Sequence, residues 1–342
     1  MSAWNGAVLP KWLQRVAIIA LVVLQVCPST AEAGVEQGPI DIPASGPDPT
    51  TADPRFFPET SFRIDNDKFL DFFQKRGGVR TFGYPVSRQF TLLGTTVQFF
   101  QRRVMQIQPD GSVDLLNVLD PAILPVNSVN FATLPAFDPT LVASAPPPTS
   151  PDILGFVQAN APNSFDGLPV GFFNNFLATV DCGAAFPNQP CNTSLLPGFD
   201  LQMWGIPTSS PAFDPNNHNF VYLRFQRGIM MFDNTAGGVT EGVLMGDALK
   251  SVITGQNLPE DLAAQTAGSR FSNQYNNSNP LGLNRPDELP NTDMTNAFVP
   301  QVPLVPVGNE EAIFGILNPD FSPQPIYTAL EDMPKPSPPV VR

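Results

Sequence analysis

Positive charge, histidine and cysteine are all scarce in this chain of 342 residues. Lys and Arg number 18 against 31 Asp and Glu, and there are one histidine and three cysteines. The shortage of Lys and Arg disfavours nucleic acid as a partner, because surfaces that bind nucleic acid are built from clustered cations. The acidic residues are spread along the chain, so we interpret them as a source of solubility.

The single histidine, His218, limits the chemistry that the sequence supports. A serine triad would need it as the base, but it lies in a turn-like, Asn-rich stretch and no G-x-S-x-G motif accompanies it. A zinc site needs about four ligands, and the chain has a single histidine. The oxygens of Asp214, Asn216 and Asn219 could bind calcium, but they lack the spacing of an EF-hand loop. We therefore interpret the stretch as a hydrogen-bonded turn and predict no catalytic residue, no metal site and no cofactor.

Hydrophobic runs long enough to span a membrane are absent. The longest apolar run, Val16 to Val26, has 11 residues, whereas a transmembrane helix needs about 20. It follows Lys11 and Arg15 and precedes an Ala-x-Ala cleavage site, Ala31 to Ala33. This order of features is typical of a secretory signal peptide, so we predict that residues 1–33 are removed on export.

Export predicts a secreted protein, free or associated with the cell surface. Two alternatives remain open, namely retention of Leu9 to Val26 as an N-terminal anchor and lipid attachment at Cys27, although Val26 fits poorly before a lipidated cysteine. After cleavage the chain would keep 16 basic and 30 acidic residues, a net charge of −14, and no membrane span.

Two cysteines remain in the predicted mature chain. Cys182 and Cys191 have eight residues between them, and in an exported protein such a pair favours a disulfide over half of a zinc site. The closed loop would stabilise the fold by about 2–3 kcal/mol through its effect on the unfolded chain.

The sequence is rich in proline and contains an internal repeat. Its 40 prolines are more than twice the ordinary share of about 5%. The repeated motif reads aromatic-Gly-x-Pro-x-Ser, then a gap, then Phe-Gln-Arg-x-x-Met, and it runs from Phe82 to Met105 and again from Trp204 to Met230. Two motifs in the same order with similar gaps indicate a tandem repeat.

The pattern around each motif predicts an α+β fold of two small tandem modules, each a helix plus a β-hairpin. In the first copy, polar residues at 65–67 would cap a helix that ends at Gly77 and Gly78, and Thr95 to Ile107 reads as the first strand of a hairpin. We predict a Pro-rich linker at 34–57, module 1 at 58–125, a Pro-rich linker at 126–152, module 2 at 153–255, and a largely irregular tail at 256–342 with a short strand and helix at 312–331.

The first copy resembles a repeated module found in exported proteins of Chloroflexi-type bacteria. Those modules carry Phe-Pro-Glu-Thr, an aromatic helix ending in Gly-Gly, Phe-Gly-x-Pro-x-Ser and Val-Gln-x-Phe-x-Arg; the matching segments are Phe57 to Thr60, Phe69 to Gly78, Phe82 to Ser87 and Val97 to Arg102. The second copy lacks the first element and the Gly-Gly pair. The pattern is more distantly similar to the Leu-Gly-Phe-Pro repeats of bacterial envelope enzymes, which implies a cell-wall-binding role.

The end of the chain is similar to the last strand and helix of (β/α)₈ glycoside hydrolases. The residues that fit are Gly315, Asp320, Pro323, Pro325, Tyr327, Ala329 and Leu330. Upstream, the sequence lacks the strand–helix alternation that a barrel needs over about 250 residues. Glu310 and Glu311 would point to opposite faces of a strand, so they could not both enter one glycosidase cleft. We interpret the similarity as a remnant or a coincidence.

Four residues of the repeated motifs are candidate ligand contacts: Tyr84, Arg102, Trp204 and Arg227. The competing interpretation is that the arginines fix the geometry of the repeats and the aromatics belong to the core. The sequence predicts a secreted or cell-surface, non-catalytic protein that binds envelope or extracellular polysaccharide through its repeats. The alternatives are a glycan-acting hydrolase, or a remnant of one, and a purely structural surface protein.

Overall fold

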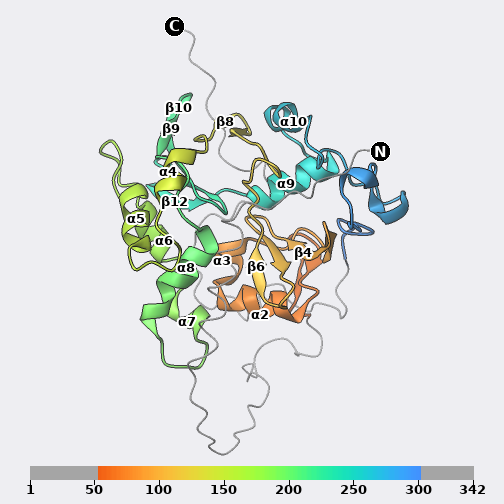
Figure 1. Ribbon diagram of the computed structural model, residues 1–342, viewed down its shortest axis with the longest axis horizontal. Coiled ribbons are helices and arrows are strands. Elements are labelled where there is room, and N and C mark those ends of the chain that lie inside the picture. Colours follow the sequence, from red (N-terminus) through yellow and green to blue (C-terminus); the bar gives the residue numbers. More distant parts are fainter. Residues whose placement is uncertain (1–52, 302–342) are drawn as a thin grey trace, which may run out of the picture.

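The computed structural model describes residues 53–301, which contain both helices and antiparallel sheets (Figure 1). The fold class is therefore α+β, as predicted. The expected signal peptide, the first 19 residues of the expected N-terminal linker, Glu310, Glu311 and the expected strand and helix at 312–331 lie outside the described residues. No helix within 53–301 is long and apolar enough to cross a membrane.

The first large sheet is a four-stranded antiparallel meander that follows two helices. Asn66 caps the first helix, because its side chain accepts a hydrogen bond from the Lys68 amide at 2.9 Å. Gly77, with φ of 95°, separates the two helices in the left-handed conformation. The elements are α2 (Asp67–Lys75), α3 (Gly78–Phe82), β3 (Phe90–Leu92), β4 (Thr95–Phe99), β5 (Val104–Ile107) and β6 (Val113–Leu115), with the strands in that order.

The second large sheet repeats this strand order after a longer helical stretch. Before it come α5 (Ile153–Asn160), α6 (Phe172–Leu177), α7 (Cys182–Ala185), the 3₁₀ turn η2 (Thr193–Leu195) and α8 (Leu196–Trp204). Its strands are β9 (Ala212–Asp214), β10 (Asn217–Arg224), β11 (Ile229–Asp233) and β12 (Val239–Gly242), and α9 (Met245–Thr254) follows. Cys182 and Cys191 form the predicted disulfide, with their Cα atoms 5.4 Å apart.

Each large sheet is bigger than the predicted hairpin. The stretch Thr95 to Ile107, predicted as one strand, is two strands, β4 and β5, because the chain turns at the Phe-Gln-Arg motif between them. The predicted returning strand is β6. Sequence reasoning missed β3 and β9, which have three residues each. Strands this short carry too little alternation to be recognised as a period-two pattern.

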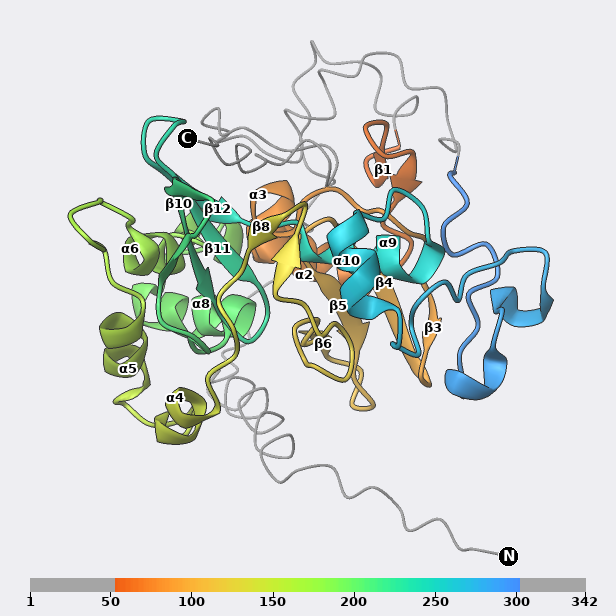
Figure 2. The ribbon, with the colours of Figure 1, turned by 90° about the horizontal axis from the view of Figure 1, so that it is seen from above.

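The two halves form one body rather than two modules held by spacers. Each of the two hydrophobic cores draws buried residues from both sheets, and α9, which follows the second sheet, packs against β4 of the first (Figure 2). Within one core the rings of Phe73 and Phe100 stack at 5.5 Å, and those of Phe176 and Phe225 stack at 6.1 Å. The shared cores explain how two small units with marginal individual cores reach stability.

The expected linker at 126–152 is packed onto the fold. It contains a small hairpin, β7 (Ser128–Val129) and β8 (Ala132–Thr133), followed by α4 (Pro139–Ser144). Val126, Val129, Ala132 and Leu134 are buried in a core. Composition suggested a spacer because prolines dominate the segment, but its few apolar residues are enough to attach it.

The described part of the expected tail, residues 256–301, is irregular and nevertheless tightly packed. It holds α10 (Glu260–Thr266) and two 3₁₀ turns, η3 (Pro280–Gly282) and η4 (Pro286–Glu288), and it buries Leu262, Phe271 and Phe298. The N-terminal hairpin of β1 (Phe56–Phe57) and β2 (Phe62–Arg63) also packs inward, with the ring of Phe57 5.8 Å from that of Phe73. The predicted linker at 34–57 therefore ends earlier than expected.

Candidate functional site

The four candidate ligand contacts are all buried. Tyr84 exposes 4% of its surface, Arg102 5%, Trp204 4% and Arg227 7%. Arg102 and Trp204 come close together, because both lie near Gly242, whose added Cβ would be 3.3 Å from each. Burial, more than any nearby charge, raises the pKa of Tyr84 to about 12. A sugar could not stack on rings that the protein already covers.

The Gly and Gln of the motif form the same contact in both halves. Gln101 Oε1 accepts the Tyr84 amide at 2.9 Å, and Gln226 Oε1 accepts the Ile206 amide at 3.2 Å. The preceding glycines have φ of 72° and 70°. A Cβ on Gly83 would lie 2.6 Å from that of Gln101, so only glycine fits where the glutamine closes over the turn.

The Ser of the motif ties the same turn to the sheet in both halves. Ser87 Oγ accepts the Phe99 amide at 2.9 Å, and Ser209 Oγ accepts the Arg224 amide at 3.1 Å. The prolines two residues earlier form isolated bridges, Pro85 to Phe100 and Pro207 to Phe225. The repeated motif is therefore explained by local backbone geometry.

The repeated arginines reach across from each half to the other. Arg102, in the turn after β4, donates from Nε to the Gly242 carbonyl at 3.1 Å and pairs with Glu241 at 3.4 Å. Arg227, at the equivalent place after β10, pairs with Asp114 at 3.3 Å. Glu241 and Asp114 occupy matching positions on the last strands of their sheets, opposite Met231 and Gln106.

Arg103 lies where the two halves meet. It is 1% exposed, its guanidinium carbon is 4.1 Å from the centre of the Trp204 ring, and Nη1 donates to the Arg102 carbonyl at 3.0 Å. The residue that matches it in the second motif is Gly228, at which a Cβ would lie 2.3 Å from Arg103 Nη1. Desolvation, followed by the charges of Arg102 and Arg227, lowers the pKa of Arg103 to about 9.

The assignment of Tyr84, Arg102, Trp204 and Arg227 as ligand contacts is thus corrected to a structural one. The arginines join the two halves and the aromatics fill the core. The sequence could not decide this, because a β-strand has two faces and the second sheet that covers one of them lies over 100 residues away.

Other titratable groups of the described residues lie outside the repeated motifs. Within residues 53–301 no group of three or more His, Cys, Asp or Glu side chains is placed to hold a metal ion. His218 stacks on Phe213 with the ring centres 4.9 Å apart. Asp214 accepts the Asn216 amide at 2.9 Å, which agrees with a hydrogen-bonded turn.

Asp200 is the acid with the most perturbed titration. It is fully buried on α8 and accepts the Val180 amide at 2.9 Å. Desolvation raises its pKa to about 8, although this amide and the charges of Arg80 and Arg76 act in the opposite direction. Because Asp200 is fully buried and desolvation is the largest cause, we assign the shift to burial in the fold.

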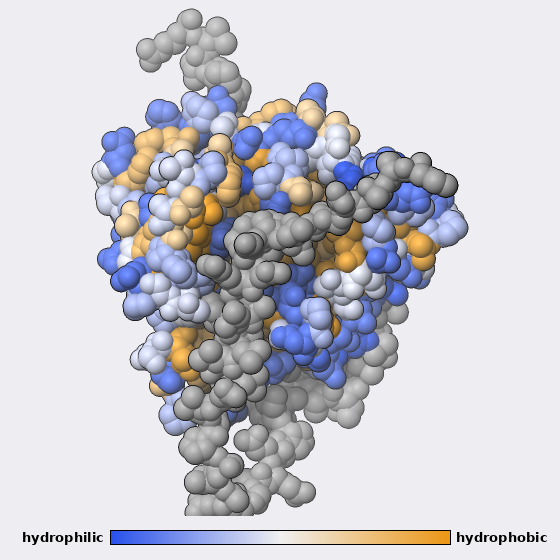
Figure 3. Space-filling view, in the orientation of Figure 1, coloured by the Kyte–Doolittle hydropathy of each residue, from blue (hydrophilic) through white to orange (hydrophobic). Residues whose placement is uncertain are grey.

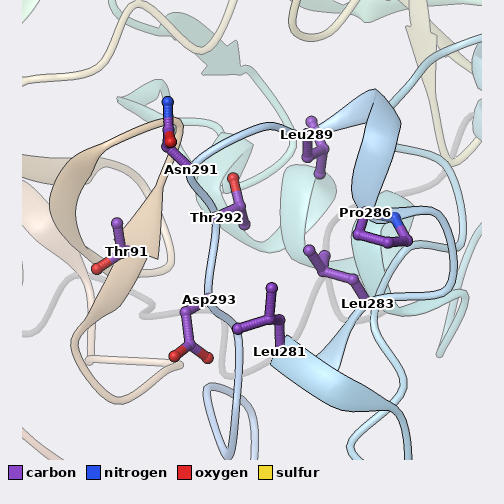
Figure 4. A pocket seen from close by; sticks show the side chains of 8 residues that line it. All are labelled: Thr91, Leu281, Leu283, Pro286, Leu289, Asn291, Thr292 and Asp293. Carbon is purple, nitrogen blue, oxygen red and sulfur yellow. The ribbon is translucent and has the colours of Figure 1, made fainter.

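An open pocket of about 380 Å³ lies between β3 and the packed tail (Figure 4). Its lining combines apolar and neutral polar side chains with a single carboxylate: Thr91, Leu281, Leu283, Pro286, Leu289, Asn291, Thr292 and Asp293. The Thr295 amide and hydroxyl hold the pKa of Asp293 below its usual range. Sequence reasoning missed the pocket because it exists only where an irregular tail docks on a strand about 200 residues earlier.

Comparisons with protein-family models, curated proteins and solved structures find no match for this chain.

Proposed function

We propose that residues 53–301 contain two copies of one module, packed so that each copy gives the other the same contacts. Three features support this: the matching strand orders, the repeated Gly–Gln and Ser contacts, and the reciprocal pairs of Arg102 with Glu241 and Arg227 with Asp114. Reciprocity of this kind is the mark of a two-fold interface in a homodimer. The matching positions Arg103 and Gly228 must differ between the copies, because a side chain at Gly228 would meet the Arg103 guanidinium.

The proposed function is non-catalytic binding of envelope or extracellular polysaccharide by an exported or cell-surface protein. The main support for a non-catalytic role is that the buried arginines of the motif and their acidic partners join the two halves. A disulfide in an exposed loop fits an oxidising, extracellular location. The face in Figure 3 intersperses polar and apolar residues, as the surfaces of folded proteins commonly do.

Retention on insoluble polysaccharide tests this function directly. The exported chain should be pulled down by isolated cell envelope or by a purified extracellular polysaccharide, and an unrelated acidic protein of similar size should stay in the supernatant. Passage of the chain through every matrix would contradict the proposal and favour a purely structural surface protein. Turnover of chromogenic glycosides, abolished by one acidic substitution, would favour a hydrolase.

A further inference from the structure

The β7–β8 hairpin carries the most exposed large apolar side chain within residues 53–301. Phe131 exposes 54% of its surface, whereas Val129 and Ala132, beside it, expose 3% and 6%. Asn130 and Phe131 form the two-residue connection, since Val129 pairs with Ala132. The fold therefore holds the base of the hairpin and leaves one aromatic ring in solvent at its tip.

The backbone of this tip is unfavourable for phenylalanine. Asn130 has φ of 53° and Phe131 has φ of 64°. Positive φ at both central residues is the mark of a type I′ turn, in which Asn-Gly is preferred and a bulky second residue is rare. A ring with more than half of its surface in solvent gains little packing to offset this strain, which points to a role outside the fold.

Side chains of α10 hold the tip in place. Asp261 Oδ2 accepts the Phe131 amide at 2.9 Å and the Ser128 hydroxyl at 2.6 Å. Gln265 accepts the Ser128 amide at 3.1 Å and donates to the Ser128 carbonyl at 3.0 Å. Because α10 is fixed in the core through Leu262, the ring stands on a rigid support, as a binding contact requires. Figure 1 shows β8 and α10 along the same edge of the molecule.

We propose that Phe131 is the stacking contact for an uncharged polysaccharide. This inference rests on the proposed function and names both its contact and its ligand class. An aromatic face carries negative potential that attracts the C–H groups on one side of a pyranose ring. The net charge of −13 opposes close approach of anionic chains such as polyuronates. A neutral glucan or mannan is therefore the ligand that fits.

The Phe131→Gly variant separates binding from folding. It removes the ring and also supplies the residue that a type I′ turn prefers. Its melting temperature should equal or exceed that of the wild type, while its apparent affinity for an insoluble neutral glucan or mannan falls about tenfold or more, as expected for loss of a central aromatic contact. Phe131→Trp should keep the binding. Leu177→Ala, which removes a 37% exposed side chain from α6, is the matched control and should bind as the wild type does.

The possible failures point to different causes. Wild-type binding that Phe131→Gly leaves intact would overturn the role of Phe131 and leave the proposed function standing. Binding of anionic polysaccharides alone would overturn the ligand class. If the wild type and Leu177→Ala elute as dimers on size exclusion and Phe131→Gly elutes as a monomer, the ring contacts a second copy of the chain instead. No binding by the wild type to any polysaccharide would remove the proposed function and this inference together.

Discussion

Gly83 and Gly205 show how one residue type can be required twice for the same reason. Each has positive φ, and each lies under a glutamine side chain that accepts the next amide. A methyl group at either position would meet the glutamine below van der Waals distance. The motif glycine is therefore needed for both backbone conformation and space.

Substitution of this glycine should be costly. Gly205→Ala is expected to lower the free energy of unfolding by about 1–3 kcal/mol, because the left-handed backbone becomes strained and the Gln226 contact is disturbed. Gly155→Ala in α5 is the matched control, since nothing lies within 4 Å of the added methyl. The control should be neutral or stabilise by up to about 1 kcal/mol. Denaturant unfolding measures both, and equal effects would refute the packing argument.

Asp200 predicts a dependence of stability on pH. Its folded pKa of about 8 lies above the ordinary value of 3.8, so the folded state holds a proton that the unfolded state releases. Stability from this group is therefore present at low pH and is lost as pH rises from about 4 to about 8. Asp200→Asn keeps an acceptor for the Val180 amide and should be more stable than the wild type at pH 8. Thermal unfolding at pH 5 and pH 8 checks this, and an equal gain at both values would contradict it.

At the scale of elements, turns at the ends of strands join the two sheets. The turn between β4 and β5 reaches β12, and the turn between β10 and β11 reaches β6. In the first pair both side chains are buried, whereas Asp114 in the second is 24% exposed. Because burial removes solvent screening, loss of a partner in the Arg102–Glu241 pair should lower stability more than loss of a partner in the Arg227–Asp114 pair.

Removal of one partner of the buried pair should destabilise strongly. Glu241→Gln removes the buried carboxylate charge that pairs with Arg102 and is expected to cost about 3 kcal/mol. Asp114→Asn should cost less. Asp71→Asn breaks an exposed pair with Lys75 and should cost no more than about 0.5 kcal/mol. Chemical denaturation of the three variants gives the order, and an equal cost for all three would show that the buried pair adds nothing.

At the scale of the whole molecule, the shared cores predict a single unfolding transition. Both clusters contain residues from both sheets, so neither half can unfold while the other keeps its core. Differential scanning calorimetry should give one peak with equal calorimetric and van't Hoff enthalpies. Two separate peaks would instead support two independent modules on linkers.

Arg103 and Gly228, the matching positions that differ between the two halves, give a second test at this scale. Gly228→Ala should destabilise the wild type because its methyl meets the Arg103 guanidinium. The same change should cost less in an Arg103→Ala background, with a coupling of about 0.5–3 kcal/mol in a double-mutant cycle. Additive effects would show that the two residues do not share this space.

The sequence predicts much of the local structure but little about which residues are free to contact a ligand. The cap at α2, the Gly-Gly break and the disulfide depend on residues near one another in the chain, and these predictions agree with the structure. The strand predicted at Thr95 to Ile107 was wrong in one respect, because the chain turns at Phe-Gln-Arg and forms two strands. Proline content predicted a spacer at 126–152, but buried apolar side chains such as Val129 attach this segment to the core. The described part of the tail, 256–301, is irregular as predicted, and its packing through Phe271 was not foreseen.

The sequence by itself determined that one motif occurs twice, and with it the turns that each motif makes. Only the tertiary structure decided that the two halves cover each other, which turned four suspected ligand contacts into buried ones and left Phe131 in solvent. The reason is physical: turn geometry is set within a few residues, whereas exposure depends on which distant surface packs on top.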